Sequence, residues 1–186
     1  MKPRTYVESP VDWAKIKTDA VVNCPALLAY GQVKSGKLII SGKTILAANI
    51  SESLMLGAYG ISSRDILTGH EEYAPYKHFF IWGNISYGDK LKASLFGGYL
   101  KNLGATKNII APFNSNPTVF GLGETIGQMI RIVPTVTYTI GNMIIGLEFE
   151  HNIAAYGAIY YSGKGKIINT TNVRGTRLFA TMYYNF

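Results

Sequence analysis

Apolar and polar side chains alternate with a period of two residues over most of the chain. In residues 78–87, for example, Ile81 and Ile85 share one face, whereas Asn84 and Ser86 lie on the other. This period is that of a β-strand whose two faces meet different surroundings. The pattern predicts eight strands, at residues 13–23, 26–34, 37–50, 78–87, 90–102, 127–139, 142–154 and 174–186.

The predicted strands are joined by connections of two kinds. Some are tight turns of hairpin type, predicted at residues 35–36, 88–89 and 140–141. The others are predicted to be long surface loops rich in Gly, Asn, Ser and Pro, at about residues 51–77, 103–126 and 155–173. Short turns at one end and long loops at the other are typical of outer-membrane barrels, although the short link at Cys24 and Pro25 breaks this regularity.

Charged side chains in the predicted strands fall largely on one face, and the opposite face of the clearest alternating segments carries no charge. Several strands also reach the roughly 9–11 residues that a tilted strand needs to cross a bilayer. We therefore expect an all-β fold, a transmembrane antiparallel up-and-down β-barrel with about eight strands in residues 1–186. The chain is expected to be one barrel domain or the C-terminal part of a larger barrel. The predicted lumen-lining residues are Lys15, Lys17, Lys43, Lys90, Lys92, Arg131, Glu148, Glu150 and Arg177.

Composition changes this picture in two respects. Of the 186 residues, 47% are hydrophobic and 16% are charged, which excludes intrinsic disorder. The longest charge-free runs contain Pro, Asn and Gly, so no membrane-spanning helix is expected. The formal net charge of +7 favours anionic partners, but the cations are scattered, and this argues against nucleic acid. On the predicted inner faces the excess of Lys and Arg predicts a preference for anions.

Aromatic residues lie near the ends of several predicted strands, where girdles at the two membrane surfaces would place them. They are Tyr87, Tyr99, Tyr138, Phe149, Tyr184 and Phe186. The segment Leu178–Phe186 resembles the C-terminal assembly signal of Gram-negative outer-membrane β-barrels, which ends in an aromatic residue, usually Phe, after apolar residues at alternate positions. The resemblance implies that Tyr184 and Phe186 belong to a membrane assembly signal read by the barrel-assembly machinery.

The resemblance extends to Leu54–Ser62, Gly98–Gly104 and Arg131–Gly157, which are similar to the C-terminal portion of porin-like outer-membrane proteins. It implies a location in the outer membrane of a Gram-negative bacterium and contact with outer-membrane lipid, with homo-oligomerisation left open. Porin-like proteins are larger barrels with cleaved signal peptides. No apolar signal region follows Met1, so we expect the C-terminal part of such a protein, with an intact eight-stranded barrel as the competing interpretation.

Candidate chemistry is sparse. His70, Glu71, Glu72 and His78 lack a known metal-ligand spacing and are expected in a solvated loop, so neither a metal nor a cofactor is predicted. No nucleophile has a recognisable base, so the chain is not expected to be an enzyme. Cys24 is expected to act as a small apolar side chain.

Pro134 stands in the middle of a predicted strand, on its apolar face, where proline removes a hydrogen-bond donor from the ladder. We therefore expect a bulge or a locally unpaired edge at this position. Complete and regular pairing around Pro134 would contradict this expectation.

Three functions fit these observations. The preferred one is a passive channel for small hydrophilic solutes. The second is a non-conducting small outer-membrane barrel whose loops bind ligands or surfaces. The third is a soluble β-sandwich or ligand-binding barrel, which predicts that a second sheet buries the uncharged face.

Overall fold

The computed structural model of the chain describes residues 6–8, 15–17, 20–50, 56–65, 67–112 and 116–186, with only the backbone described at 6–8 and 15–17. Strands dominate these residues, and the other regular element is a single 3-10 turn, Tyr161–Gly163, in the described part. No helix in the described ranges is long and apolar enough to cross a membrane.

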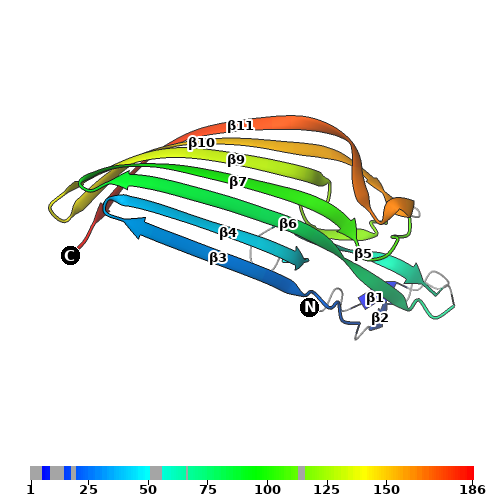
Figure 1. Cartoon of the computed structure of the whole chain (residues 1–186). Coiled ribbons are helices and arrows are strands. Elements are labelled where there is room, and N and C mark those ends of the chain that lie inside the picture. The colour runs from blue at the N-terminus through cyan, green and yellow to red at the C-terminus, as the bar shows by residue number, and fades with distance from the viewer. Residues whose placement is uncertain (1–5, 9–14, 18–19, 51–55, 66, 113–115) are drawn as a thin grey trace.

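Long antiparallel strands lie side by side in one bowed sheet (Figure 1). Its main path has the order β11-β10-β9-β7-β6-β4-β3, and β5 and β8 are attached beside β6, giving nine strands. The strands are β3 (Ala26–Ser35), β4 (Leu38–Ala48), β5 (Gly57–Arg64), β6 (Glu71–Gly88), β7 (Leu91–Ala105), β8 (Val119–Leu122), β9 (Ile126–Ile140), β10 (Met143–Tyr160) and β11 (Lys166–Tyr184). The all-β, antiparallel, up-and-down fold is confirmed.

Tight turns join neighbouring strands at one end of the sheet. They occupy residues 36–37, 89–90 and 141–142, one residue later than predicted in each case. Gly36 and Gly141 have φ values of 58° and 57°, a left-handed conformation that glycine adopts without steric cost. These two glycines therefore set the hairpins β3–β4 and β9–β10.

The predicted long loops are wrong in extent. Residues 51–77 contain β5 and the first part of β6, and residues 103–126 contain β8. Residues 155–173 hold the end of β10, the 3-10 turn and the start of β11, so the true connection there is short. At this end of the strands apolar and polar residues no longer alternate. The predicted strands therefore end before the observed strands do.

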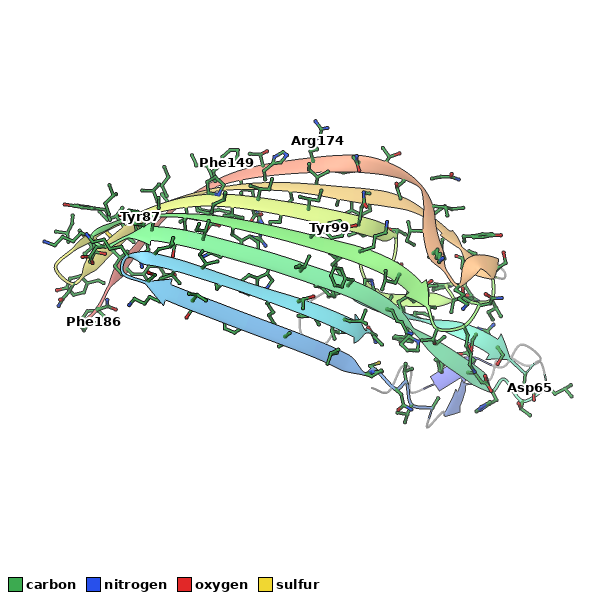
Figure 2. The ribbon with its side chains drawn as sticks, in the orientation of Figure 1. Asp65, Tyr87, Tyr99, Phe149, Arg174 and Phe186 are labelled. Atoms are coloured by element: carbon green, nitrogen blue, oxygen red, sulfur yellow. The ribbon has the colours of Figure 1, made fainter. Side chains whose placement is uncertain are left out.

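The two faces of the sheet differ as the alternation predicted. On β9 the face that holds Ile130, Ile132 and Val136 is exposed, whereas Thr135 and Thr137 on the other face are partly covered. Phe149 lies on the same face as Ile130, Ile132 and Val136, and its side chain projects outward from the convex side of the bowed sheet (Figure 2). We call the convex, mostly apolar surface the outer face and the concave surface the inner face.

Large apolar side chains on the outer face are left uncovered by the rest of the described chain. Ile132, Val136 and Leu147 are 45%, 48% and 52% exposed. A second sheet packed on this face would bury such residues almost completely. The prediction of a soluble β-sandwich is therefore not met by the described residues.

The apolar part of the outer face ends at a border of polar side chains. Register places Lys77 next to Ala48, and Lys101 next to Phe79 and Gln128, all on the outer face. The β6–β7 register shifts between Lys77 and His78, at the same level. On β10 and β11 the border lies closer to the tight turns. Its outer-face residues there are His151, Thr176 and Arg174. We call the sheet between the tight turns and this border the wall.

Beyond the border, β5, β8 and the ends of β6 and β7 enclose a conventional core. Its buried residues, which we call the loop-end cluster, are Ala58, Ala74, Tyr76, Ala105, Ile109 and Val119, with Ile159 and Tyr161 packed against them. Strand pairing holds this cluster together. β5 pairs with β6, where Tyr59 is opposite Pro75, and with β8, where Tyr59 is opposite Phe120. The Tyr76 hydroxyl is buried and has no hydrogen-bond partner among the described residues, and burial raises the pKa of Tyr76 well above its usual value.

The sheet has two edges, β3 and β11, and no register in the described residues joins them. Five strands separate β3 from β11 on the main path, and every neighbouring pair is antiparallel. The two edges therefore run in the same direction. An antiparallel barrel closes only if a strand of opposite direction lies between them. The predicted strand 13–23 falls partly outside the described residues, and residues 20–25 form no strand.

Pairing is interrupted at Pro134 on one side. The β9–β10 register runs from Glu148 opposite Thr135 to His151 opposite Ile132 without a shift, and it skips the two pairs between them. On the other side Pro134 is paired with Leu95. The prediction of a locally unpaired edge is confirmed on the β10 side of β9, and the alternative of a bulge is wrong, because the register on both sides of the gap is the same.

Candidate functional site on the inner face

The charged residues predicted to line a lumen are mostly gathered on the inner face. Register places Lys43 opposite Trp82, Lys92 opposite Thr137, and Glu148 opposite Thr135, each on this face. The remaining members there, Arg131, Glu150 and Arg177, are neighbours on β9, β10 and β11.

Three predicted lumen residues lie elsewhere. Lys90 is in the turn after β6 and not on a strand. Lys15 and Lys17 bound the short strand β2 (Lys15–Lys17), which pairs with β1 (Tyr6–Glu8) in a separate two-stranded sheet. Their backbone is therefore not part of the wall, and their side chains lie outside the described residues.

Glu150 is the centre of an ionic network across three strands. Its side chain is 1% exposed and pairs with the guanidinium groups of Arg131 and Arg177. Arg177 Nε donates to Glu150 Oε1 at 3.0 Å, and Asn152 Nδ2 donates to the same oxygen at 2.6 Å. A buried carboxylate needs such partners, because an unpaired one would lose its hydration without compensation.

This network leaves positive charge facing the concave side. One carboxylate cannot neutralise two guanidinium groups, and the Arg131 and Arg177 side chains remain 43% and 59% exposed. Arg177 also lies over the ring of Phe179, at 5.2 Å from the ring centre. Across β3 to β11 the inner-face cations Lys34, Lys43, Lys92, Arg131 and Arg177 outnumber the anions Glu148 and Glu150 by five to two.

Beside Arg131 the inner face is aromatic and hollowed. A hollow of about 320 Å³ is lined by Phe80, Trp82, Phe96, Leu100, Met129 and Arg131, with Leu56 from the segment before β5. The Trp82 and Phe96 rings lie 5.8 Å apart at 37°, and Tyr30 lies 6.2 Å from Trp82. The period of two puts Phe80, Trp82 and Phe96 on the same face of their strands as the charged residues. Large aromatic residues at such positions were the signal in the sequence for the hollow.

The residues weighed as metal ligands do not all lie in a solvated loop as expected, because Glu71 and His78 are buried in β6. Arg64 Nε donates to Glu71 Oε1 at 2.8 Å, and the Tyr73 hydroxyl donates to Glu71 Oε2 at 2.5 Å. Lys107 pairs with Glu72 at 3.2 Å and lowers the pKa of that carboxyl. In the described part of the chain no group of three or more His, Cys, Asp and Glu residues could hold a metal ion.

The aromatic residues expected in girdles are not all at strand ends. Tyr87 lies near the tight turns and Tyr99 farther toward the loop end, with Phe149 between them along the strands (Figure 2). The expectation of a strand end is therefore wrong for Phe149, which lies within β10, although it is the last outer residue before His151 at the border. Tyr184 ends β11 opposite Met143, and the ring of Phe186 packs edge-on against it at 5.3 Å.

Comparisons of the chain with protein-family models, with curated proteins and with solved structures found no match.

Proposed function

We propose that the chain forms the wall of an outer-membrane β-barrel, in a Gram-negative bacterium, through which small hydrophilic solutes diffuse passively. The observation that carries the proposal is that apolar and charged side chains occupy the opposite places from those that they occupy in a water-soluble protein. The outer face is apolar and uncovered, whereas the inner face holds a buried, fully paired carboxylate and most of the charge. Such a sheet suits lipid on one side and water on the other.

Two further observations support the proposal. The wall segment of β6 between Lys77 and the tight turn has about the length that a tilted strand needs to cross a bilayer. The C-terminal strand carries the apolar alternation of an assembly signal, with Tyr184 and Phe186 at its end. Outer-membrane lipid and the barrel-assembly machinery are accordingly its proposed partners.

The inner-face charge gives the proposed channel a direction of selectivity. Five cations against two anions on the concave side produce a positive potential, which favours anions over cations in a water-filled pore. Width is the remaining requirement, since about eight strands leave an interior that side chains fill, whereas sixteen or more leave a channel. Conductance therefore requires that strands beyond the seven of the main path lie between β11 and β3 in the barrel that the protein forms in the membrane.

The test is the reversal potential of the refolded protein in planar bilayers under a KCl gradient. We expect discrete conductance steps and a reversal potential on the anion side. The double variant Lys43→Glu, Lys92→Glu should move it toward cations. Lys101→Glu is the matched control, because Lys101 lies on the outer face and the change in charge per site is the same.

Two results would contradict the proposal. Cation preference in the unchanged protein would overturn the selectivity. Full insertion into vesicles without any conductance would overturn the channel and favour the second function, a closed barrel whose loop end binds ligands or surfaces. The loop-end cluster gives that second function a folded platform outside the wall.

A further inference from the structure

The aromatic hollow differs from the rest of the inner face. Most of the inner surface nearer the tight turns is polar, with Ser41, Asn84 and Ser94 at neighbouring positions. By contrast, the hollow brings Trp82, Phe96 and other large apolar side chains to the side of the sheet that the proposed function fills with water. Apolar surface in such a place is a feature that a solute can use.

The hollow is preformed by the packing beneath it. Phe80 and Leu100 are buried together with Ile45 and Ala47, and Leu56 and Met129 pack against this cluster. Its volume of about 320 Å³ is at the small end of the range for ligand pockets, which is roughly 300–1,000 Å³. A solute of a single ring or a short aliphatic chain fits this size.

Arg131 supplies one charged group at the rim of the hollow. The residue opposite Arg131 on β7 is Gly98, which has no side chain to cover the guanidinium group. Glu150 is shared with Arg177 and Asn152, so the pair of arginines keeps an unneutralised positive charge. Arg131 Nε is buried without a hydrogen-bond partner in the described residues, and the side chain as a whole is 43% exposed, so a solute would meet this guanidinium group at its Nη atoms. The two Nη atoms of an arginine can hold a carboxylate through two parallel hydrogen bonds.

We infer that the hollow binds small monocarboxylates with an apolar body, with the carboxylate on Arg131 and the body against Trp82 and Phe96. The inference rests on the proposed function, since it names the class of solute that the inner face would select. The positive charge of Arg131 and the apolar surface of the hollow both favour this class of solute. A hydrophilic neutral solute would leave the aromatic surface unused, and an inorganic anion would use Arg131 alone.

The experiment measures binding in detergent micelles, without any membrane, by the emission of Trp82. The chain has two tryptophans, so Trp13→Phe leaves Trp82 as the reporter. The probes are 3-phenylpropionate and its neutral isostere 3-phenylpropionamide. We expect the acid to quench or shift the emission at concentrations about ten- to a hundredfold below those needed for the amide, the range of a charge-assisted hydrogen bond.

Variants separate the two parts of the site. Arg131→Gln should remove the preference for the acid and leave amide binding unchanged, whereas Phe96→Ala should weaken both probes. Arg131→Lys keeps the charge without the paired donors and should retain part of the preference. Lys101→Gln is the matched control, because it removes one positive charge from the outer face of β7, the strand that pairs with β9 beside Arg131, and should change neither probe.

Equal binding of acid and amide to the unchanged protein would overturn the inference, as would an acid preference that survives in Arg131→Gln. Far-ultraviolet circular dichroism shows whether each variant keeps its sheet, and Arg131→Lys remains informative if Arg131→Gln does not fold. Acid-selective binding without conductance would overturn the channel and leave the site standing. Conductance without acid-selective binding would overturn the site and leave the channel standing.

Discussion

The wall and the loop-end cluster use the same kinds of side chain in opposite places. In the wall, Ile132 and Leu147 project from the outer face and stay about half exposed. In the loop-end region, Ile61 and Tyr76 are fully buried, both 0% exposed, beneath short strands that fold over them. The two regions share strands, because β6 and β7 run through both.

This difference bears on which medium, water or lipid, surrounds each region. Burying an apolar side chain against other protein is favourable in water, so a water-exposed region collects its apolar residues inside. Lipid removes that requirement, and a strand in lipid instead must satisfy its backbone groups and keep charge off its outer face. Under the proposed function, the border residues Lys77 and Lys101 would lie at a membrane surface and the loop-end cluster beyond it.

Loss of buried apolar volume gives the largest expected effect. We expect Ile61→Ala to lower the free energy of unfolding by about 2–5 kcal/mol, since it leaves a cavity in a packed interior. Ile132→Ala is the matched control in the wall, where lipid fills the space that the side chain leaves, and its cost should be clearly smaller. Urea unfolding of both proteins refolded in lipid vesicles measures the difference. Equal losses would mean that the two regions share one kind of core.

A charge on the outer face is expected to cost somewhat less. Val136→Arg places a cation in the middle of the apolar band, between Ala93 and Leu147, and should lower the free energy of unfolding by about 2–4 kcal/mol, the range for arginine at a bilayer midplane. Thr135→Arg, at the preceding residue of the same strand on the inner face, should be tolerated because water reaches it. The same vesicle unfolding assay compares them, and a larger loss for Thr135→Arg would reverse the assignment of the faces.

A smaller effect is expected from the buried hydroxyl of Tyr76. Tyr76→Phe removes a hydroxyl that has no partner and should raise the free energy of unfolding by about 1 kcal/mol. The pKa of Tyr76 is raised in the folded protein, so above pH ~10 the unfolded state loses this proton first and stability falls as pH rises. Tyr76→Phe should reduce that loss. Chemical denaturation at pH 8 and pH 11 checks both signs, and an unchanged difference between the two pH values would show that Tyr76 does not contribute.

The wall could be predicted from the sequence because its surroundings impose a strict period of two. Ile130, Ile132 and Val136 show that period plainly, and the break in pairing at Pro134 follows from the missing N–H of proline. Strand β5 and the extended end of β10 could not be predicted in this way, since both of their faces meet protein or water and the period is lost.

The ionic network and the hollow depend on register, which one sequence does not specify. Glu150 lies 19 residues from Arg131 and 27 from Arg177 along the chain, and the pairing of β10 with both neighbours brings the three together. Leu56 reaches the hollow from a segment that the pattern assigned to a surface loop. The aromatic inner positions of β6 and β7 were visible in the sequence, but their meeting beside Arg131 was not.

The central claim is that the outer face of the wall contacts lipid, and spin-label accessibility along β9 tests it most directly. In a Cys24→Ser background, single cysteines from residue 130 to residue 139 are labelled in vesicles and exposed to oxygen, which enters lipid, and to a polar nickel chelate, which does not. We predict high oxygen and low nickel accessibility at Ile130, Ile132 and Val136, alternating with the inner positions. Low accessibility to both reagents at the outer positions, or high nickel accessibility there, would contradict the claim.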